Sequence, residues 1–263
     1  MEFILHPQIP FIDIAFAFHY NKSRNEVNAM NSSSELQGYT TYRDGANELS
    51  ESRYNLTIGL TLAWGFLLNF LTVRLAGPKI IEMLYRNPDQ YSNLMLGFLV
   101  AYFALVIGGA RLLRSESPLT CFIGYNLIAV PVGVVLTTAV IQYDPYLVYR
   151  ACLYTAIITL LMMIAATLYP RFFAQVGGGL GVALLATIIV ELAAMLLFRQ
   201  DLTITDWIVV GIMALYVGYD WTRANAVQRT ATNAIAAAAE LYLDIINILI
   251  RLMRILSRSK ERN

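Results

Sequence analysis

Long apolar runs, separated by short polar islands, repeat along most of the chain from residue 55 onward. Each run is about 20 residues long, which as a helix matches the thickness of the hydrocarbon core of a bilayer. The pattern predicts seven membrane-spanning helices, at about residues 55–76, 91–113, 118–142, 147–169, 172–198, 203–222 and 232–256. The expected fold class is therefore an all-α polytopic membrane protein.

Three segments of different composition divide the chain. Residues 1–54 form a polar N-terminal segment that we expect to be partly disordered, because residues 20–53 are rich in Asn, Ser, Glu and Arg. Residues 55–258 form the predicted seven-helix transmembrane domain, in which 77–90 is expected to be a polar connector. A basic C-terminal tail, 259–263, follows it. The expected basic stretch at this end of the chain comprises Arg251, Arg254, Arg258, Lys260 and Arg262.

Composition agrees with a membrane protein. Of the 263 residues, 57% are hydrophobic and only 14% are charged, whereas a soluble domain carries about a quarter charged residues. The expected surroundings are therefore a lipid bilayer. The net charge of +1 and the lack of a basic helix with interleaved aromatic residues give no indication of a nucleic-acid partner. Cys121 and Cys152 lie in apolar runs and are expected to be small buried hydrophobic residues.

The last apolar run carries a narrow polar stripe. Read as a helix, Glu240, Asp244, Asn247 and Arg251 fall at i, i+4, i+7 and i+11, which places them on one face. A further carboxylate, Asp220, lies near the end of the preceding run. An ionisable group within a span is costly unless it faces the bundle interior, a watery cavity or a partner. The stripe and Asp220 are therefore a hypothesis for the functional site.

Other polar residues in the runs have simpler interpretations. Glu191 is expected at a membrane interface, with its carboxylate reaching toward the headgroups. Asn247 is expected to form a hydrogen bond between helices. Glu240 could be a helix-packing contact or an acid at the mouth of a pathway. The glycine run 177–181 predicts a helix–helix contact, since no strand precedes it and no Lys-Ser/Thr follows, as a phosphate loop requires.

The C-terminal residues resemble those of a known family. Tyr219-Asp220, then Asp244 within Leu241-Tyr-Leu-Asp-Ile-Ile-Asn247, then Leu252-Met-Arg254-Ile-Leu, look like the signature of the Bax inhibitor family (transmembrane BAX inhibitor motif proteins), in a bacterial-type branch. The resemblance covers about residues 55–258. It implies seven helices with the last one central and ringed by the other six. It also implies calcium leak across a membrane, gated by protonation of a paired aspartate.

The resemblance assigns roles to particular residues. Asp220 and Asp244 match the two aspartates of the family's pH-sensing pair. The family's latch is an arginine at the end of the second span, where this chain has both Arg111 and Arg114. Family members often carry an acid midway along the second span, and residues 91–110 here have none. The bacterial-type branch implies a bacterial inner (plasma) membrane.

The chemistry of such a pair follows from its surroundings. Two carboxylates held close in a low-dielectric place cannot both ionise cheaply, so the pair shares a proton that ties its helices together. Loss of that proton leaves two like charges, which repel or attract a cation. Calcium takes 6–8 oxygen ligands, so Asp220 and Asp244 alone are expected to hold it only transiently. A neighbouring arginine would compete for a carboxylate through bidentate hydrogen bonds and hold a closed state. Taken with the calcium leak that the resemblance implies, this chemistry leads to the hypothesis of a pH-sensitive calcium-permeable leak channel or exchanger without a cofactor, moving calcium or protons.

Two other classes of function compete with a channel or exchanger. An enzyme is not expected: the only histidines, His6 and His19, precede the first span, and no serine nucleophile is flanked by glycines. An intramembrane aspartyl protease would need a Gly-X-Gly-Asp setting, which is absent around Asp220 and Asp244. The alternative function is a membrane interaction protein that regulates a membrane quality-control protease or a cell-death or stress pathway through a membrane-protein partner. In that case the aspartates would be structural, with Asp244 satisfied by an Arg, Asn or Tyr.

Overall fold

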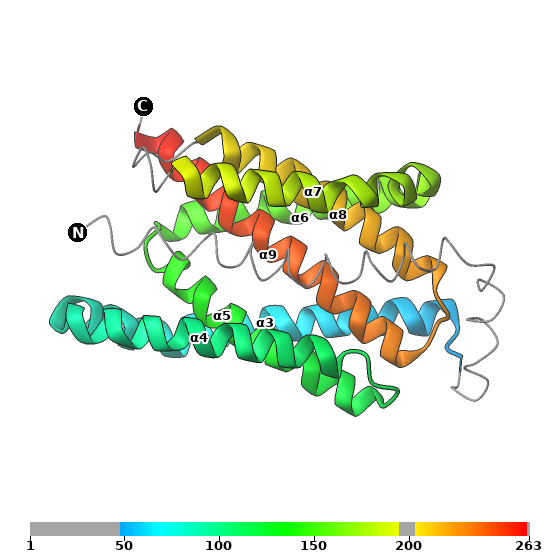
Figure 1. The fold of residues 1–263 in the computed structure, drawn as a ribbon, viewed down its shortest axis with the longest axis horizontal. Coiled ribbons are helices and arrows are strands. Elements are labelled where there is room, and N and C mark those ends of the chain that lie inside the picture. The colour runs from blue at the N-terminus through cyan, green and yellow to red at the C-terminus, as the bar shows by residue number, and fades with distance from the viewer. Residues whose placement is uncertain (1–47, 195–202, 262–263) are drawn as a thin grey trace.

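The structure, a computed structural model, describes residues 48–194 and 203–261. Within these ranges the chain is helical, with seven helices and no strand, as predicted. In chain order they are α3 (Glu51–Arg86), α4 (Pro88–Leu112), α5 (Pro118–Val140), α6 (Pro145–Leu168), α7 (Pro170–Ala193), α8 (Thr203–Ala226) and α9 (Ala231–Glu261) (Figure 1). Most of the predicted N-terminal segment 1–54 and the last two residues of the tail lie outside the described residues.

Proline marks the start of four consecutive helices. α4, α5, α6 and α7 each begin with proline in the first turn, where its missing N–H costs nothing and its fixed φ suits a helix. Two of these starts are also capped by a side chain. Asp144 Oδ1 accepts from the Tyr146 N–H at 2.8 Å, and Ser117 accepts from the Thr120 N–H. The polar islands between the apolar runs thus fix where each helix begins.

The prediction of a connector at 77–90 was wrong for most of that stretch. α3 continues through Gly77 and Pro78 to Arg86, and only Asn87 separates it from α4. A proline inside a helix costs about 3 kcal/mol, and the Glu82–Arg86 pair at 3.0 Å returns less than about 0.5 kcal/mol. α3 packs along α5 as far as Gly77, which lies beside Ile141, and the turns from Pro78 to Arg86 extend beyond this contact and are largely exposed.

α9 lies at the centre of the bundle. Figure 1 shows it crossing between α3, α4 and α5 on one side and α6, α7 and α8 on the other. It packs directly against α3, α5, α6 and α8, and from Leu241 to Ile255 its residues are buried. The expected central position of the last helix is confirmed. The expected ring is less regular, because α4 packs chiefly on α5.

The face of α9 that meets α3 and α5 is held by a buried tyrosine. The hydroxyl of Tyr242 donates to Asn69 Oδ1 at 2.8 Å and lies 3.3 Å from the carbonyl oxygen of Ala129. Asp244 is two residues further along α9, which on a helix turns it toward the opposite side, where α8 packs. This hydrogen bond therefore fixes the rotation of α9 that directs Asp244 at α8.

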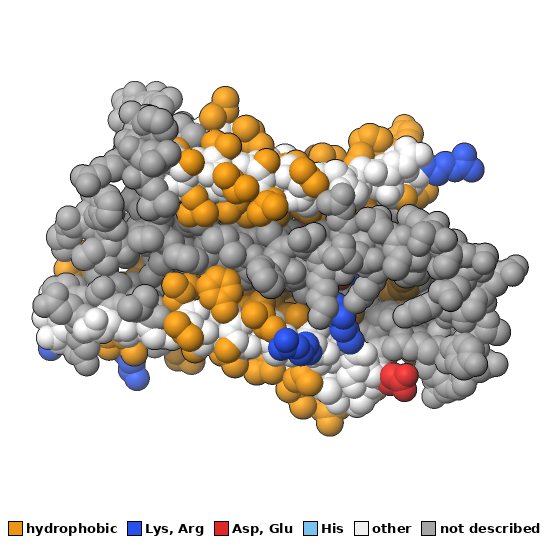
Figure 2. Space-filling view, in the orientation of Figure 1, with side chains coloured by type: hydrophobic (Ala, Val, Ile, Leu, Met, Phe, Trp, Pro, Cys, Tyr) orange, Lys and Arg blue, Asp and Glu red, His pale blue; other side chains and the backbone are white. Residues whose placement is uncertain are grey.

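The outer surface is apolar, as a bilayer requires. Among the described residues, four helical segments are long and apolar enough to cross a membrane: Glu51–Met83, α5, α6 and α7. A shorter apolar stretch, Gly97–Leu112, lies in α4. On the face that Figure 2 shows, hydrophobic side chains gather over α4 and α7, and Leu105, Leu185 and Ile189 are among the exposed ones. The protein is an integral membrane protein.

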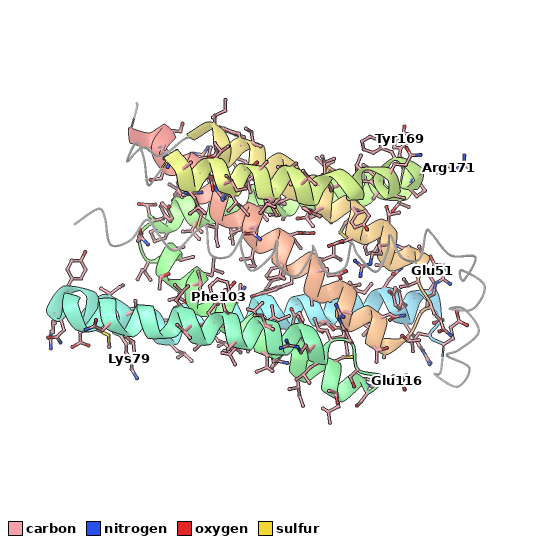
Figure 3. The ribbon with its side chains drawn as sticks, in the orientation of Figure 1. Glu51, Lys79, Phe103, Glu116, Tyr169 and Arg171 are labelled. Carbon is pink, nitrogen blue, oxygen red and sulfur yellow. The ribbon has the colours of Figure 1, made fainter. Side chains whose placement is uncertain are left out.

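The helices begin and end at two opposite ends of the bundle. Glu51, Glu116, Tyr169 and Arg171 lie toward one end (Figure 3), which we call the Glu51 end. α9 ends at the other, which we call the Ser259 end.

At the Glu51 end the start of α3 is tied to the turn between α8 and α9. The Leu49 N–H donates to the Arg229 carbonyl at 2.7 Å, Glu51 pairs with Arg229 at 3.3 Å, and the Tyr54 hydroxyl donates to the Ala224 carbonyl at 2.9 Å.

The two cysteines differ in burial. Cys121 is buried at the start of α5, and its thiol donates to the carbonyl oxygens of Leu113 and Ser115. Cys152 is exposed on α6, so the expectation that both are buried was wrong for it. An apolar run does not show which of its faces meets the outside of the bundle, since α6 is apolar on both.

Candidate functional site: an acid pair and an ion-pair cluster on one helix face

Asp220 of α8 and Asp244 of α9 meet inside the bundle. Both side chains are buried, with 1% and 0% of their surface exposed, and they are close enough for their carboxyl groups to interact with each other. α8 and α9 are joined only by the short turn around 227–230, so they run antiparallel and bring two acids distant in sequence to the same level. We call these two residues the acid pair.

Asp244 lies in a setting without hydrogen-bond donors. Neither of its oxygens receives a hydrogen bond from an N–H or O–H group of the described residues. The side chains that act on it electrostatically are acidic ones, Asp220 and Glu240. Because two carboxylates are both acceptors, their contact becomes a hydrogen bond only when one of them carries a proton. The arrangement is chemically suited to a shared proton.

A basic residue that sequence reasoning missed lies beside the acid pair. Arg223 Nη2 donates to Glu240 Oε1 at 3.0 Å, and Arg223 also hydrogen-bonds the side chain of Tyr219, which interacts electrostatically with Asp220. The spacing could have revealed it, since Arg223 follows Asp220 by three residues and shares its helix face. Glu240 is thus an ion-pair partner between α8 and α9, one turn of α9 nearer to the Glu51 end than Asp244.

Close approach of α7 and α8 fixes the helix turn that carries Asp220. A Cβ on Gly177 would lie 2.1 Å from the ring of Tyr219, and one on Gly218 would lie 2.1 Å from the ring of Phe173. Each glycine therefore receives an aromatic ring of the other helix, at a spacing that no other residue permits. The prediction of a helix–helix contact is confirmed for Gly177, while Gly178 and Gly179 face open space.

The structure does not bring the predicted latch residues to Asp244. Arg111 is exposed in the last turn of α4, and Arg114 is exposed just beyond it. α4 packs chiefly on α5, whereas the acid pair lies between α8 and α9. Neither arginine donates a hydrogen bond to Asp244.

A second group of charged residues lies toward the Ser259 end, and we call it the ion-pair cluster. Arg251 of α9 binds Glu191 of α7 with both terminal nitrogens, Nη2 to Oε2 at 2.9 Å, and its Nη1 also donates to Asp206 Oδ1 of α8 at 2.9 Å. Asp206 is further paired with Arg254 and, at 2.9 Å, with Arg258. The cluster joins α7, α8 and α9.

Three predictions are corrected by the ion-pair cluster and the stripe. Glu191 does not reach for a membrane interface, because its side chain is only 13% exposed and binds the buried Arg251. Arg251 and Arg254 are not part of a solvated basic tail, because they lie buried within α9. Asn247 does not bridge helices: its Nδ2 donates to the Leu243 carbonyl of its own helix at 3.1 Å.

Asp206 had no signal in the sequence beyond its acidity at the start of an apolar run. Its role depends on α9 presenting arginines at the same depth, which is a property of the antiparallel packing of α8 on α9. The predicted stripe of Glu240, Asp244, Asn247 and Arg251 does lie on buried α9. It leads from the Arg223–Glu240 pair, past the acid pair, to the ion-pair cluster.

A tight metal site is not part of this arrangement. Within residues 48–194 and 203–261, no group of three or more His, Cys, Asp or Glu side chains is placed to hold a metal ion. A divalent cation at the acid pair would meet too few protein oxygens to lose its water shell.

Comparison with protein families places these features in a known context. The family model described as "Inhibitor of apoptosis-promoting Bax1" matches residues 51–262. The chain belongs to this family. The match spans all seven described helices, and with them both the acid pair and the ion-pair cluster. Searches among curated proteins and among solved structures give no match.

Proposed function

We propose that this member of the Bax1-inhibitor family is a pH-sensitive calcium-permeable leak channel or exchanger, gated by the pair Asp220 and Asp244. The observation that carries the proposal is the proximity of these two carboxyl groups, buried between α8 and α9, where Asp244 receives no hydrogen bond from the described residues. A purely structural aspartate would be expected to have a donor or a basic partner.

The proposed gating step is the loss of one shared proton. With the proton present, a hydrogen bond between the two carboxyl groups holds α8 against α9. Without it, two negative charges face each other in a place from which water is excluded, and their repulsion favours separation of the helices or entry of a cation. Calcium passes as a partly hydrated ion, and protons are the other proposed permeant species. The acids have no catalytic role in this scheme, and it uses no cofactor.

The Arg223–Glu240 pair supports this scheme from the Glu51 end. It joins α8 to α9 at 3.0 Å, with the arginine one-third exposed, so it lies between the acid pair and the outside. A latch made by Arg111 or Arg114 would require the end of α4 to approach the acids. The proposed location is a bacterial inner membrane, which accords with the apolar outer helices.

The test is calcium flux into proteoliposomes across a range of pH. Wild-type flux is expected to rise as pH rises and the shared proton is lost, whereas Asp244→Asn and Asp220→Asn should each flatten this dependence. Asp144→Asn is the matched control, because Asp144 is an exposed acid that caps α6. Equal and pH-independent flux in all four proteins would reject the gating role of the pair.

A second candidate function is supported by the family description, which names inhibition of a protein that promotes apoptosis. On this proposal the chain is a membrane interaction protein that regulates a membrane quality-control protease or a stress pathway. It predicts no calcium flux in the wild type, together with specific capture of a membrane protease that Asp244→Asn leaves intact. Flux without such capture would exclude it.

A further inference from the structure

The helices on the two sides of α9 form two separate groups. Among the described residues, α3, α4 and α5 pack on one another, α6, α7 and α8 pack on one another, and no helix of the first group packs extensively on a helix of the second. Figure 1 shows α9 between the two groups. The chain passes from the first group to the second once, in the turn 141–144 between α5 and α6. This turn lies at the Ser259 end, because α5 begins beside Glu116 at the Glu51 end (Figure 3).

Close helix contacts make each group rigid. A Cβ on Gly109 of α4 would lie 2.6 Å from the carbonyl oxygen of Gly124 of α5, so the two backbones touch there. A Cβ on Gly65 of α3 would overlap the hydroxyl group of Tyr125 of α5. Contacts of this kind hold helices at short distance and leave little room for sliding. The glycines of α7 and α8 described above interlock the second group in the same way.

Charged side chains bind α9 to the second group. In the ion-pair cluster, Arg251 binds Glu191 of α7 and Asp206 of α8, and all three are largely buried. Nearer the Glu51 end, Arg223 of α8 binds Glu240 of α9. Buried ion pairs are costly to part, because each charge is then left in the interior without its partner. α6, α7, α8 and α9 are therefore expected to move as one body.

The first group meets α9 through neutral side chains around Tyr242. The Tyr242 hydroxyl donates to Asn69 Oδ1 of α3 at 2.8 Å. The centroid of its ring lies 5.7 Å from that of Tyr125 of α5 and 5.9 Å from that of Phe66 of α3. Neutral contacts part without leaving a charge in the interior, so the cost of opening is lower here than at the buried ion pairs. The interface between α9 and the first group is therefore the easier of the two to open.

Three interactions fasten this interface at the Glu51 end, and we call Leu49, Glu51 and Tyr54 the strap. The Leu49 N–H donates to the Arg229 carbonyl at 2.7 Å, Glu51 pairs with Arg229 at 3.3 Å, and the Tyr54 hydroxyl donates to the Ala224 carbonyl at 2.9 Å. Ala224 lies in the last turn of α8, where carbonyl groups have no partner within the helix. The side chains of Glu51 and Arg229 are 67% and 40% exposed, so water replaces their ion pair when it parts. The strap thus joins the two groups through contacts that break and re-form at low cost.

We propose that α3–α5 and α6–α9 are two bodies that swing apart at the Glu51 end about the turn 141–144, and that the strap holds them closed. The movement uncovers the face of α9 around Tyr242 from the Glu51 end. It goes beyond the proposed function, since both residues of the acid pair lie in the second body and stay together while it moves.

Distances between two spin labels, measured by double electron–electron resonance in lipid nanodiscs, test the proposal. The background protein carries Cys121→Ser and Cys152→Ser, so labels attach only to introduced cysteines. Glu116→Cys with Arg171→Cys places one label on each body at the Glu51 end (Figure 3). Both residues are exposed, so the labels are expected to leave the packing intact.

Two further label pairs report on the hinge and on the second body. Lys79→Cys with Ser259→Cys measures the separation of the two bodies near the Ser259 end, and Arg171→Cys with Asn225→Cys measures a distance between α7 and α8. All four residues are exposed. The proposal predicts a change at the Glu51 end between the bodies and none at these two pairs.

Substitutions in the strap and its partner supply the comparison. Tyr54→Phe removes the hydrogen bond to α8 and keeps the ring, and should lengthen part of the Glu116–Arg171 distances by about 5 Å. Arg229→Gln removes only the exposed ion pair and should produce the same lengthening in a smaller share of the molecules. Tyr149→Phe is the matched control, because Tyr149 is an exposed tyrosine of α6, and it should leave all three distances unchanged.

Each outcome supports or overturns the proposal. Unchanged distances at the Glu51 end in both Tyr54→Phe and Arg229→Gln overturn it. A comparable lengthening at the Ser259 end overturns the hinge, and one between α7 and α8 overturns the second body. Because Arg229 is partly exposed, its substitution decides even if Tyr54→Phe fails to fold. None of these distances depends on calcium, so pH-independent flux would reject the proposed function and leave the two bodies standing.

Discussion

α8 brings two buried aspartates to α9, and they meet opposite partners. Asp206 is paired with three arginines that share one face of the last turns of α9, Arg251, Arg254 and Arg258, whereas Asp220 meets another acid, Asp244. Both aspartates are 1% exposed. Burial is therefore the same at the two places, and only the charge of the facing residue differs.

The facing charge makes the ion-pair cluster a fixed contact and the acid pair a contact that depends on pH. A buried ion pair resists change, because removal of either partner leaves an uncompensated charge in the interior. A carboxyl pair, in contrast, depends on a single proton, which the surrounding solution can supply or remove. The same helix interface thus carries one contact that is fixed and one that responds to pH.

Disruption of the ion-pair cluster should have the largest effect on stability. Arg251→Met removes the guanidinium that binds both oxygens of the largely buried Glu191, and should lower the free energy of unfolding by about 3–5 kcal/mol. Thermal or denaturant unfolding in detergent measures it. The double variant Glu191→Leu with Arg251→Met should recover much of the loss, because no charge is then left unpaired. Equal stability of Arg251→Met and wild type would mean that the ion-pair cluster does not stabilise the packing of α7, α8 and α9.

A substitution that disturbs only the packing around the acid pair should have a smaller effect on stability. Gly177→Ala places a Cβ in the ring of Tyr219, next to Asp220, and should cost about 1–3 kcal/mol through overpacking. It should also alter the pH dependence of calcium flux while leaving the cluster intact. Gly178→Ala is the neighbouring control, because it faces open space and should gain up to about 1 kcal/mol in helix propensity. Similar effects of the two substitutions would contradict the contact.

The pH dependence of stability should distinguish the two places directly. If the folded pair holds one shared proton that the unfolded chain releases, the folded state binds more protons and its stability falls as pH rises. For one proton the slope is about 1.4 kcal/mol per pH unit. Unfolding measured between about pH 5 and about pH 8 should show this slope in the wild type and lose it in Asp244→Asn. A slope that persists in Asp244→Asn would assign the proton to another group.

The smallest effect is expected at the Arg223–Glu240 pair. It is partly exposed, with the arginine side chain at 33%, so solvent screens it and Arg223→Gln should cost about 1 kcal/mol or less. Its effect on flux should be larger than on stability, because the pair lies between the acid pair and the Glu51 end. Unchanged flux in Arg223→Gln, measured at several pH values, would remove it from the route.

The sequence was informative about the helices and about one face of α9. Apolar runs predicted seven helices, and the regular spacing of Glu240, Asp244, Asn247 and Arg251 predicted a shared face, because helical periodicity is a local property. The partners of these residues were harder to foresee. Glu191, Asp206 and Arg251 meet only because α7, α8 and α9 pack at matching depths, and no local pattern encodes that depth. For Arg223 the sequence predicts part of the arrangement. Its spacing from Asp220 indicates a shared helix face, but nothing in the sequence indicates that it pairs with Glu240.

The short connection at the Glu51 end has a mechanical consequence. Leu49, Glu51 and Tyr54 attach the start of α3 to Arg229, within the turn that joins α8 to α9, and to Ala224, in the last turn of α8. A pull on the chain ahead of Glu48 would therefore act on the connection between the two helices that carry the acid pair, as well as on α3 itself.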